Sequence, residues 1–279
     1  DVLFLALPHG LSEKMTKKAL ENDVKVFDLG ADFRLDDSET YEKWYDVKHE
    51  FPEINQSAVY GLPELNRGRI KESQVVACPG CYPTSAILGT APLLKNKVVK
   101  TDKIIIDSKS GVSGAGRSAK IDTIFTEVNE SFKAYGVLKH RHTPEIKQEM
   151  DKLSESDMNV VFTPHLLPIN RGILSTIYLE VNEKWKESLT EEKICEIYND
   201  FYKNEYFVRV TKDLPEIKNV KNSNICEIGV RYDKEFGNIV VVSAIDNLIK
   251  GAGGQAVQRM NILFGFEENE GLEFLSMYL

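Results

Sequence analysis

Two cysteines in the segment 78–84, Cys-Pro-Gly-Cys-Tyr-Pro-Thr, are the residues best suited to chemistry. An apolar run that ends at Cys78 predicts a buried strand, and the small, apolar stretch 85–94 predicts a buried helix. Cys81 therefore lies on the turn between them, where Gly80 supplies backbone freedom. Because a helix N-terminus favours negative charge, this position favours a reactive thiolate. The spacing indicates one nucleophile, Cys81, with Cys78 packed inside.

Three other interpretations of this motif stay open. A zinc half-site needs a second ligand pair at short spacing, whereas Cys195 and Cys226 lie far apart in a predicted helix and a predicted strand. A dithiol redox pair also begins a helix after a strand, but the surrounding order of elements does not match a thioredoxin-like domain. The simplest alternative is a pair of cysteines packed at a turn. We expect no metal site.

A second cluster of chemical groups is the segment 139–145, which holds two of the five histidines among cations and a carboxylate. A cysteine nucleophile needs an acid/base partner that titrates near neutrality, and His140 or His142 can fill that role. Thr143 is predicted to cap a helix whose first residue is Pro144. A solvated charged loop that starts a helix is the alternative.

Two glycine-rich segments complete the candidate chemistry. Residues 107–117 follow a predicted strand and are expected to form a loop whose backbone N–H groups and cations could bind phosphate or carboxylate. This loop is not the dinucleotide fingerprint, which must join the first strand and helix of a βαβ unit. Residues 246–255 lead into the last predicted helix, so their amides could face a cofactor or anion.

The elements that position these groups fall into two kinds. Strand, helix and strand over residues 3–7, 12–22 and 24–29 predict a βαβ unit and a parallel sheet, with Ser12 as the helix N-cap. Later strands with few intervening helices predict a mixed or antiparallel sheet. These strands are expected at 103–107, 159–163, 174–181, 225–232 and 239–245, with helices at 190–203 and 254–264.

Composition excludes several classes of partner. The 279 residues are 42% hydrophobic and 28% charged, with a formal net charge of −8 and no basic block, so we expect no nucleic acid. We expect no membrane span, no secretory signal and reduced thiols, which together predict a cytoplasmic protein. Because a strand begins at the first residues, the sequence is expected to be the later part of a longer chain.

Six motifs in order along the chain resemble the N-acetyl-gamma-glutamyl-phosphate reductase family, in a wider group that includes aspartate-semialdehyde dehydrogenase. The motifs are residues 5–10, 28–34, 60–64, 79–84, 140–145 and 164–172. The resemblance implies an α/β plus α+β fold: a partial Rossmann-type domain for NADP, then a mixed-sheet catalytic and oligomerisation domain. We place them at 1–81 and 82–247, with 248–279 returning to the first. The family's Gly-x-x-Gly-x-x-Gly turn does not precede Leu3, so weak NADP binding is expected.

The resemblance implies NADPH-dependent reduction of N-acetyl-glutamyl 5-phosphate to the semialdehyde and phosphate, through a thioester on Cys81. His140 is the predicted acid/base and His142 the second choice. The predicted substrate-binding residues are Ser110, Arg117, His142, Glu145 and Arg34. The predicted cofactor-binding residues are Pro8, His9, Gly111, Gly114 and Asn247.

The resemblance also implies a small acyl phosphate as partner and a homo-oligomer, dimer or tetramer. An aspartyl phosphate is disfavoured by the Gly-Cys-Tyr-Pro string at 80–83, while an amino-adipyl phosphate stays open. Arg171 is interpreted as domain structure or as an interface residue.

Overall fold

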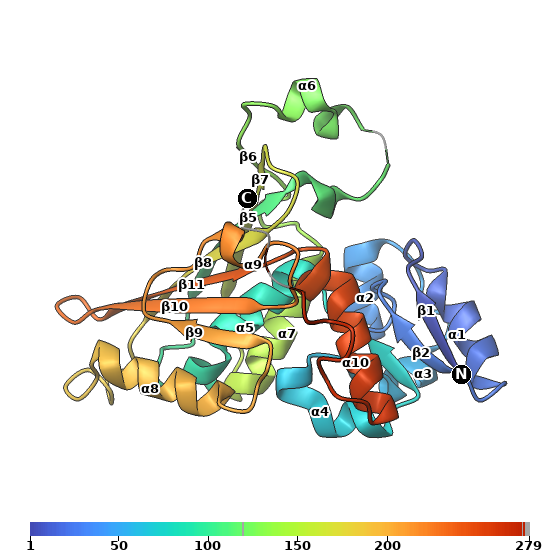
Figure 1. The fold of residues 1–279 in the computed structure, drawn as a ribbon, viewed down its shortest axis with the longest axis horizontal. Coiled ribbons are helices and arrows are strands. Elements are labelled where there is room, and N and C mark those ends of the chain that lie inside the picture. Colours follow the sequence, from blue (N-terminus) through green and yellow to red (C-terminus); the bar gives the residue numbers. More distant parts are fainter. Residues whose placement is uncertain (119, 275, 277–279) are drawn as a thin grey trace. The chain divides into compact units, whose positions relative to one another are not determined.

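A computed structural model describes residues 1–118, 120–274 and 276 of the chain. These residues form two compact units (Figure 1). The first comprises Asp1–Gly80 and Ala252–Glu273, and the second consists chiefly of Cys81–Gly251.

The first unit is built on a parallel sheet. Its strands are β1 (Val2–Leu5), β2 (Lys25–Asp28), β3 (Val59–Tyr60) and β4 (Val75–Ala77), in the spatial order β1-β2-β4-β3. Its helices are α1 (Ser12–Leu20), α2 (Ser38–Tyr45), α3 (Pro52–Ser57), α4 (Pro63–Glu72) and α10 (Gly254–Phe264). The strand-helix-strand prediction for the start of the chain is confirmed.

Alternation along the strands divides the core of this unit between the two faces of the sheet, because successive side chains of a strand point to opposite sides. On one face, Val26 and Val75 pack with side chains that include Ala19 of α1 and Ile54 of α3. The opposite core holds Phe27, Val76, Ile70, Ala256 and Ile262, so α4 and α10 cover that side.

Ser12 does not cap α1 as predicted. The helix begins at Ser12, and Leu11 occupies the cap position without a side-chain hydrogen bond. The backbone N–H groups of Ser12 and Gly10 instead donate to the carboxylate of Asp32, at 3.0 and 2.9 Å, and the Tyr41 hydroxyl donates to the same group at 2.8 Å. A carboxylate from another loop therefore satisfies this helix end, which local sequence could not reveal.

The second unit is built on a mixed seven-stranded sheet with the order β6-β7-β5-β8-β11-β10-β9. Its strands are β5 (Ile104–Gly111), β6 (Lys133–Ala134), β7 (Val160–Leu167), β8 (Ile173–Glu180), β9 (Val208–Thr211), β10 (Cys226–Asp233) and β11 (Asn238–Ile245). Pairs β5–β7 and β9–β10 are parallel and the others antiparallel. The predicted mixed sheet is confirmed.

The principal helices of this unit are α5 (Cys81–Lys95), α7 (His142–Ser154) and α8 (Glu191–Tyr202), and a short helix α9 (Ile217–Val220) precedes β10. Helix α5 lies against the sheet (Figure 1). Buried hydroxyls join the two, since Ser85 of α5 donates to Ser175 at 2.9 Å and Ser175 bonds Ser108 at 2.7 Å. On the opposite sheet face, Ile105 and Tyr178 are 37% and 45% exposed.

Helix α5 contains Pro92, which lacks the N–H that would bond the carbonyl of Leu88. The hydroxyl of Tyr202 in α8 donates to that carbonyl at 2.6 Å, and Tyr198 donates to the carbonyl of Gly89 at 2.5 Å. Two tyrosines of one helix thus satisfy the backbone next to the proline of another. This arrangement explains how α5 stays a single helix and holds Cys81 at its first position.

Two expected boundaries in this unit are wrong. Strand β5 continues through Gly111, so the first part of the expected loop at 107–117 is strand, because β7 and β8 pair with it on both sides. Helix α7 begins at His142, and neither a cap by Thr143 nor a first residue at Pro144 is observed.

An arm, residues 112–118 and 120–138, joins β5 to α7 and projects from the end of the sheet (Figure 1). It holds short turns, the helix α6 (Phe125–Val128) and the strand β6. Large apolar side chains of the arm face solvent, with Ile121 77% and Phe125 79% exposed. Nowhere in the described residues does a helix reach the length and apolarity that crossing a membrane requires.

Candidate active site

The two cysteines of the segment 78–84 occupy different environments. Cys81 is half-buried. Because it is the first residue of α5, its thiol lies at a helix N-terminus, where a thiolate is favoured. Cys78 is 1% exposed and belongs to the core of the first unit. Burial raises the pKa of the Cys78 thiol, and Arg259 opposes that effect. All four cysteines lie in the described residues, and no disulfide joins them.

An aromatic cage surrounds His140 beside Cys81. The rings of Tyr82, Tyr135 and Phe162 meet the His140 imidazole edge-on, with centroids 5.5, 5.5 and 5.4 Å away. The hydroxyls of Tyr82 and Tyr135 bond each other at 2.8 Å. Burial, with a smaller contribution from the charge of Cys81, raises the pKa of both phenols, to about 12 for Tyr135. The thiol and the imidazole therefore share one cage.

Burial, and then the neighbouring charge of Arg141, lower the pKa of His140 to about 4. The ring is therefore neutral at pH 7. Its Nδ1 accepts the backbone N–H of His142 at 3.1 Å, which assigns the remaining proton to Nε2. The ring of His142 lies 4.8 Å from that of His140. A histidine that titrates near neutrality was expected at this position, and the burial of its ring explains the difference.

Three residues predicted from the glycine-rich segments meet in this unit. Ser110 is 2% exposed, and a hydrogen bond with it lowers the pKa of the caged phenol of Tyr82, against the larger effect of burial. Asn247 is 1% exposed; its Oδ1 accepts the N–H of Gly172 at 2.7 Å and its Nδ2 donates to Ser113 at 3.0 Å. A Cβ on Gly114 would lie 3.1 Å from the Ser110 Oγ.

Gly111 ends β5 at a close backbone contact. A Cβ there would lie 2.7 Å from the carbonyl oxygen of Asn170, so only glycine fits. Glu145, by contrast, is fully buried in the first turn of α7, and Arg117 is exposed on the arm. Their substrate-binding roles stay predictions.

The remaining predicted residues belong to the first unit. Arg34 is 7% exposed and donates from Nε to the carbonyl of Cys78 at 2.7 Å and from Nη2 to that of Leu29 at 2.9 Å. These bonds join the ends of β2 and β4. Pro8 and His9 follow β1 and are exposed, and the His9 ring lies 4.8 Å from that of Tyr45. Roles in binding substrate or cofactor stay predictions for all three.

The sequence analysis missed the cage. Tyr82 adjoins Cys81 in the motif, and that adjacency was a usable signal. Tyr135 lies in the arm and Phe162 within β7, and neither is next to a residue with chemical function in the sequence, so they carry no local signal. Only the packing of β7 against the start of α5 brings them together.

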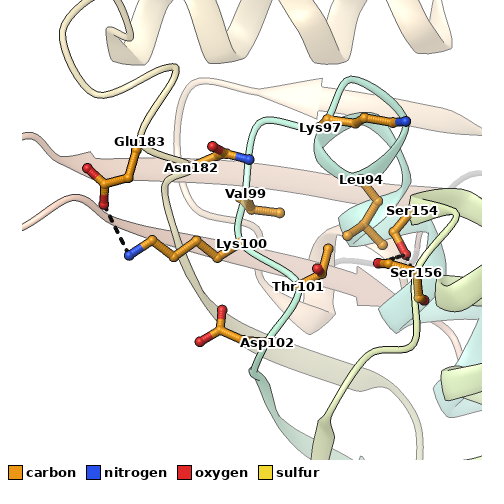
Figure 2. Close-up of a pocket in the computed structure, with 10 residues that line it drawn as sticks. All are labelled: Leu94, Lys97, Val99, Lys100, Thr101, Asp102, Ser154, Ser156, Asn182 and Glu183. Atoms are coloured by element: carbon orange, nitrogen blue, oxygen red, sulfur yellow. Dashed lines mark hydrogen bonds and ion pairs between the residues drawn. The ribbon is translucent and has the colours of Figure 1, made fainter.

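A pocket lies near the other end of α5 (Figure 2). It includes Leu94, which is about 20 Å along the helix from Cys81 at 1.5 Å per residue. Its cations face carboxylates: Lys100 pairs with Glu183 at 3.2 Å. This pocket is therefore separate from the caged thiol. In the ranges that the structure describes, no group of three or more His, Cys, Asp or Glu side chains could hold a metal ion.

Known proteins resemble the chain over both units. The family described as "Semialdehyde dehydrogenase, NAD binding domain" matches residues 1–73, and "Semialdehyde dehydrogenase, dimerisation domain" matches 81–247. An aspartate semialdehyde dehydrogenase II from Vibrio cholerae has a TM-score of 0.69 at 18% identity, covering 95% of this chain and 79% of its own. At that identity the likeness concerns the fold.

Two sequence relatives are much more similar. The N-acetyl-gamma-glutamyl-phosphate reductase of Pelotomaculum thermopropionicum is 55% identical, covering 100% of this chain and 80% of the relative. The enzyme of the same name from Clostridium beijerinckii is 52% identical, covering 99% and 80%. The chain therefore belongs to the N-acetyl-gamma-glutamyl-phosphate reductase family, within the semialdehyde dehydrogenases.

Proposed function

We propose that this protein reduces N-acetyl-glutamyl 5-phosphate with NADPH, forming N-acetyl-glutamate 5-semialdehyde and phosphate, a step of arginine biosynthesis. The observation that carries the proposal is the half-buried Cys81 at the start of α5, in one cage with His140. Relatives that carry the name of this activity and are 50–55% identical support it.

In the first half of the reaction, the Cys81 thiolate attacks the acyl carbon. A carbon–sulfur bond forms, and phosphate leaves with the electrons of its bond to that carbon. The start of α5 favours the thiolate before the attack. Because the resulting thioester is retained on the protein, one difficult reduction is divided into two easier steps.

In the second half, the thioester carbon is reduced and the tetrahedral oxyanion collapses, which expels the Cys81 thiolate and releases the aldehyde. His140, neutral at pH 7 with its proton on Nε2, is suited to donate a hydrogen bond to that oxyanion. The cage of Tyr82, Tyr135 and Phe162 covers part of the imidazole and fixes its orientation. The predicted acid/base residue thus acts chiefly as a donor.

The residues after β1 fit a dinucleotide. In parallel α/β sheets, such ligands bind beyond the carboxyl ends of the strands, which is where Pro8 and the exposed His9 lie. Gly10 follows with φ +80°, and its N–H is held by Asp32. We assign NADP contacts to Pro8 and His9, with Gly111, Gly114 and Asn247 as further candidates. When bound, NADPH supplies hydride.

The reaction in the oxidative direction tests the proposal. N-acetylglutamate semialdehyde, phosphate and NADP are supplied, and NADPH formation is followed. Cys81→Ser should lower kcat by about a thousandfold or more, because a hydroxyl is a far weaker nucleophile. Cys195→Ser, which changes a half-buried thiol in α8, is the matched control and should retain activity. Substantial turnover by folded Cys81→Ser would reject the mechanism, and preference for aspartate semialdehyde or an amino-adipate semialdehyde would reject the substrate.

We also assign a homo-oligomer contact to the open face of the second sheet. Ile105 and Tyr178 are exposed there, and the matching domain is described as a dimerisation domain. Tyr178→Glu should weaken self-association in light-scattering measurements, while Tyr206→Glu, at another exposed tyrosine, should not. Equal masses for both variants and the unaltered protein would contradict this assignment.

A further inference from the structure

Cys81 contacts a glycine from the far end of the second unit. A Cβ built on Gly251 would lie 2.7 Å from the Cys81 Cβ and 3.2 Å from its Cα. Gly251 has no positive φ, so the requirement for glycine here is one of space. It lies in a π-helical turn, η3 (Ile249–Gly253), immediately before α10. Such turns are rare and occur frequently at functional sites.

The carboxylate of Asp246 holds this turn. Its Oδ1 accepts the backbone N–H groups of Leu248 and Ile249, at 2.8 and 3.0 Å. The backbone carbonyl of Asp246 accepts the N–H of Gly251 at 2.9 Å. One residue at the end of β11 therefore fixes three N–H groups between itself and the glycine on Cys81.

The other oxygen of Asp246 is held from two further loops. Its Oδ2 accepts the N–H of Asn222 at 2.7 Å and Arg171 Nη1 at 3.3 Å. Arg171 also donates to the Asn222 side chain at 3.1 Å. Asp246 is 0% exposed, so its charge requires these partners, and Asn222 takes the left-handed φ of +64° to present its N–H.

The next residue extends the same junction toward the anion-binding candidates. Asn247 joins Gly172 and Ser113, so the loops after β5, β7 and β11 are fixed to one another. Arg171 adjoins Gly172 in the first of these contacts. The carboxylate of Asp246 and its partner Arg171 therefore fix the positions of the loops next to the turn that contacts Cys81.

We propose that Arg171 and Asp246 form a positioning device that sets the location of the Cys81 thiol through Gly251. The device rests on the proposed function, for which Cys81 must meet an acyl carbon in a defined direction. Arg171 acts through the Asp246 carboxylate and the η3 turn, and it is a positioning residue.

Two readouts test this proposal: steady-state kinetics of the proposed reduction, and the rate of Cys81 alkylation by iodoacetamide across pH. Gly251→Ala should lower kcat on the order of 100-fold with KM nearly unchanged, because a displacement near 1 Å has that effect. Alkylation should slow by about tenfold or more. Gly68→Ala is the matched control, because a Cβ there meets nothing within 4 Å.

Arg171 supplies a second test that leaves the Cys81 contact itself unaltered. Arg171→Met should reproduce the fall in kcat and the slower alkylation in part, and Arg171→Lys should restore both, since it returns a cation to the buried carboxylate. Unchanged alkylation and kcat in folded Gly251→Ala and Arg171→Met would overturn the proposal. Alkylation needs no substrate, so it separates this outcome from failure of the proposed reaction, which Cys81→Ser measures.

Discussion

The caged imidazole of His140 predicts a pH dependence of stability that can be measured directly. In the unfolded chain this group has an ordinary pKa of 6.5, and burial lowers that value to about 4 in the folded protein. The unfolded state therefore binds more protons between these values. The contribution of His140 to the free energy of unfolding is therefore fully present above pH 6.5. It falls as the pH decreases and is lost below about pH 4.

The fall of the pKa from 6.5 to about 4 corresponds to at most about 3.4 kcal/mol of folding stability. Between pH 7.5 and 5, where only part of the shift is expressed, the free energy of unfolding should fall by about 2 kcal/mol through this residue. His140→Asn keeps an acceptor for the His142 N–H but cannot take up the proton. The cavity left by the smaller asparagine side chain lowers the free energy of unfolding by an amount that does not vary with pH.

Urea unfolding at the two pH values, followed by tryptophan fluorescence, measures the difference. A Trp44→Phe background leaves Trp185 as the reporter, and it belongs to the second unit. Asp28 titrates in the same window, because burial and then Asp32 raise its pKa to about 6, and it stabilises the fold at low pH. The effect of Asp28 is the same with and without the His140→Asn substitution, so it cancels when the two proteins are compared. Parallel pH dependences for the two proteins would refute the assignment of His140 as a partly buried, neutral imidazole.

Three further predictions concern residues outside the caged thiol. Cys78→Ala should keep measurable reduction and lose about 1 to 2 kcal/mol of stability in urea, and complete inactivity in a folded protein would restore the dithiol interpretation. Arg34→Met should lower stability by about 2 kcal/mol with KM unchanged, because its Nε and Nη2 donate to backbone carbonyls, whereas a raised KM at full stability would favour substrate binding. Tyr202→Phe should lower the free energy of unfolding, measured in urea, by about 1 to 2 kcal/mol, since the carbonyl of Leu88 loses this donor near Pro92, and unchanged stability would contradict that role.

Sequence alone predicted the kinds of element and the place of Cys81 at the start of a helix. Apolar periodicity over residues 3–29 predicted strand, helix and strand because burial on one face repeats at a fixed spacing. The Cys81 turn followed from a strand and a helix that are adjacent along the chain. Helix α10 was predicted near residues 254–264 and is observed at Gly254–Phe264.

Tertiary structure decided everything that depends on partners distant along the chain. The end of β5 at Gly111 was fixed by its two neighbouring strands, and the partner of the first N–H groups of α1 by Asp32, so local sequence misassigned the strand end and the helix cap. The neutral state of His140 depends on burial by aromatic rings from three separate segments. The contact of Gly251 with Cys81 joins residues 170 positions apart, and close packing at such a separation leaves no periodic signal in the sequence.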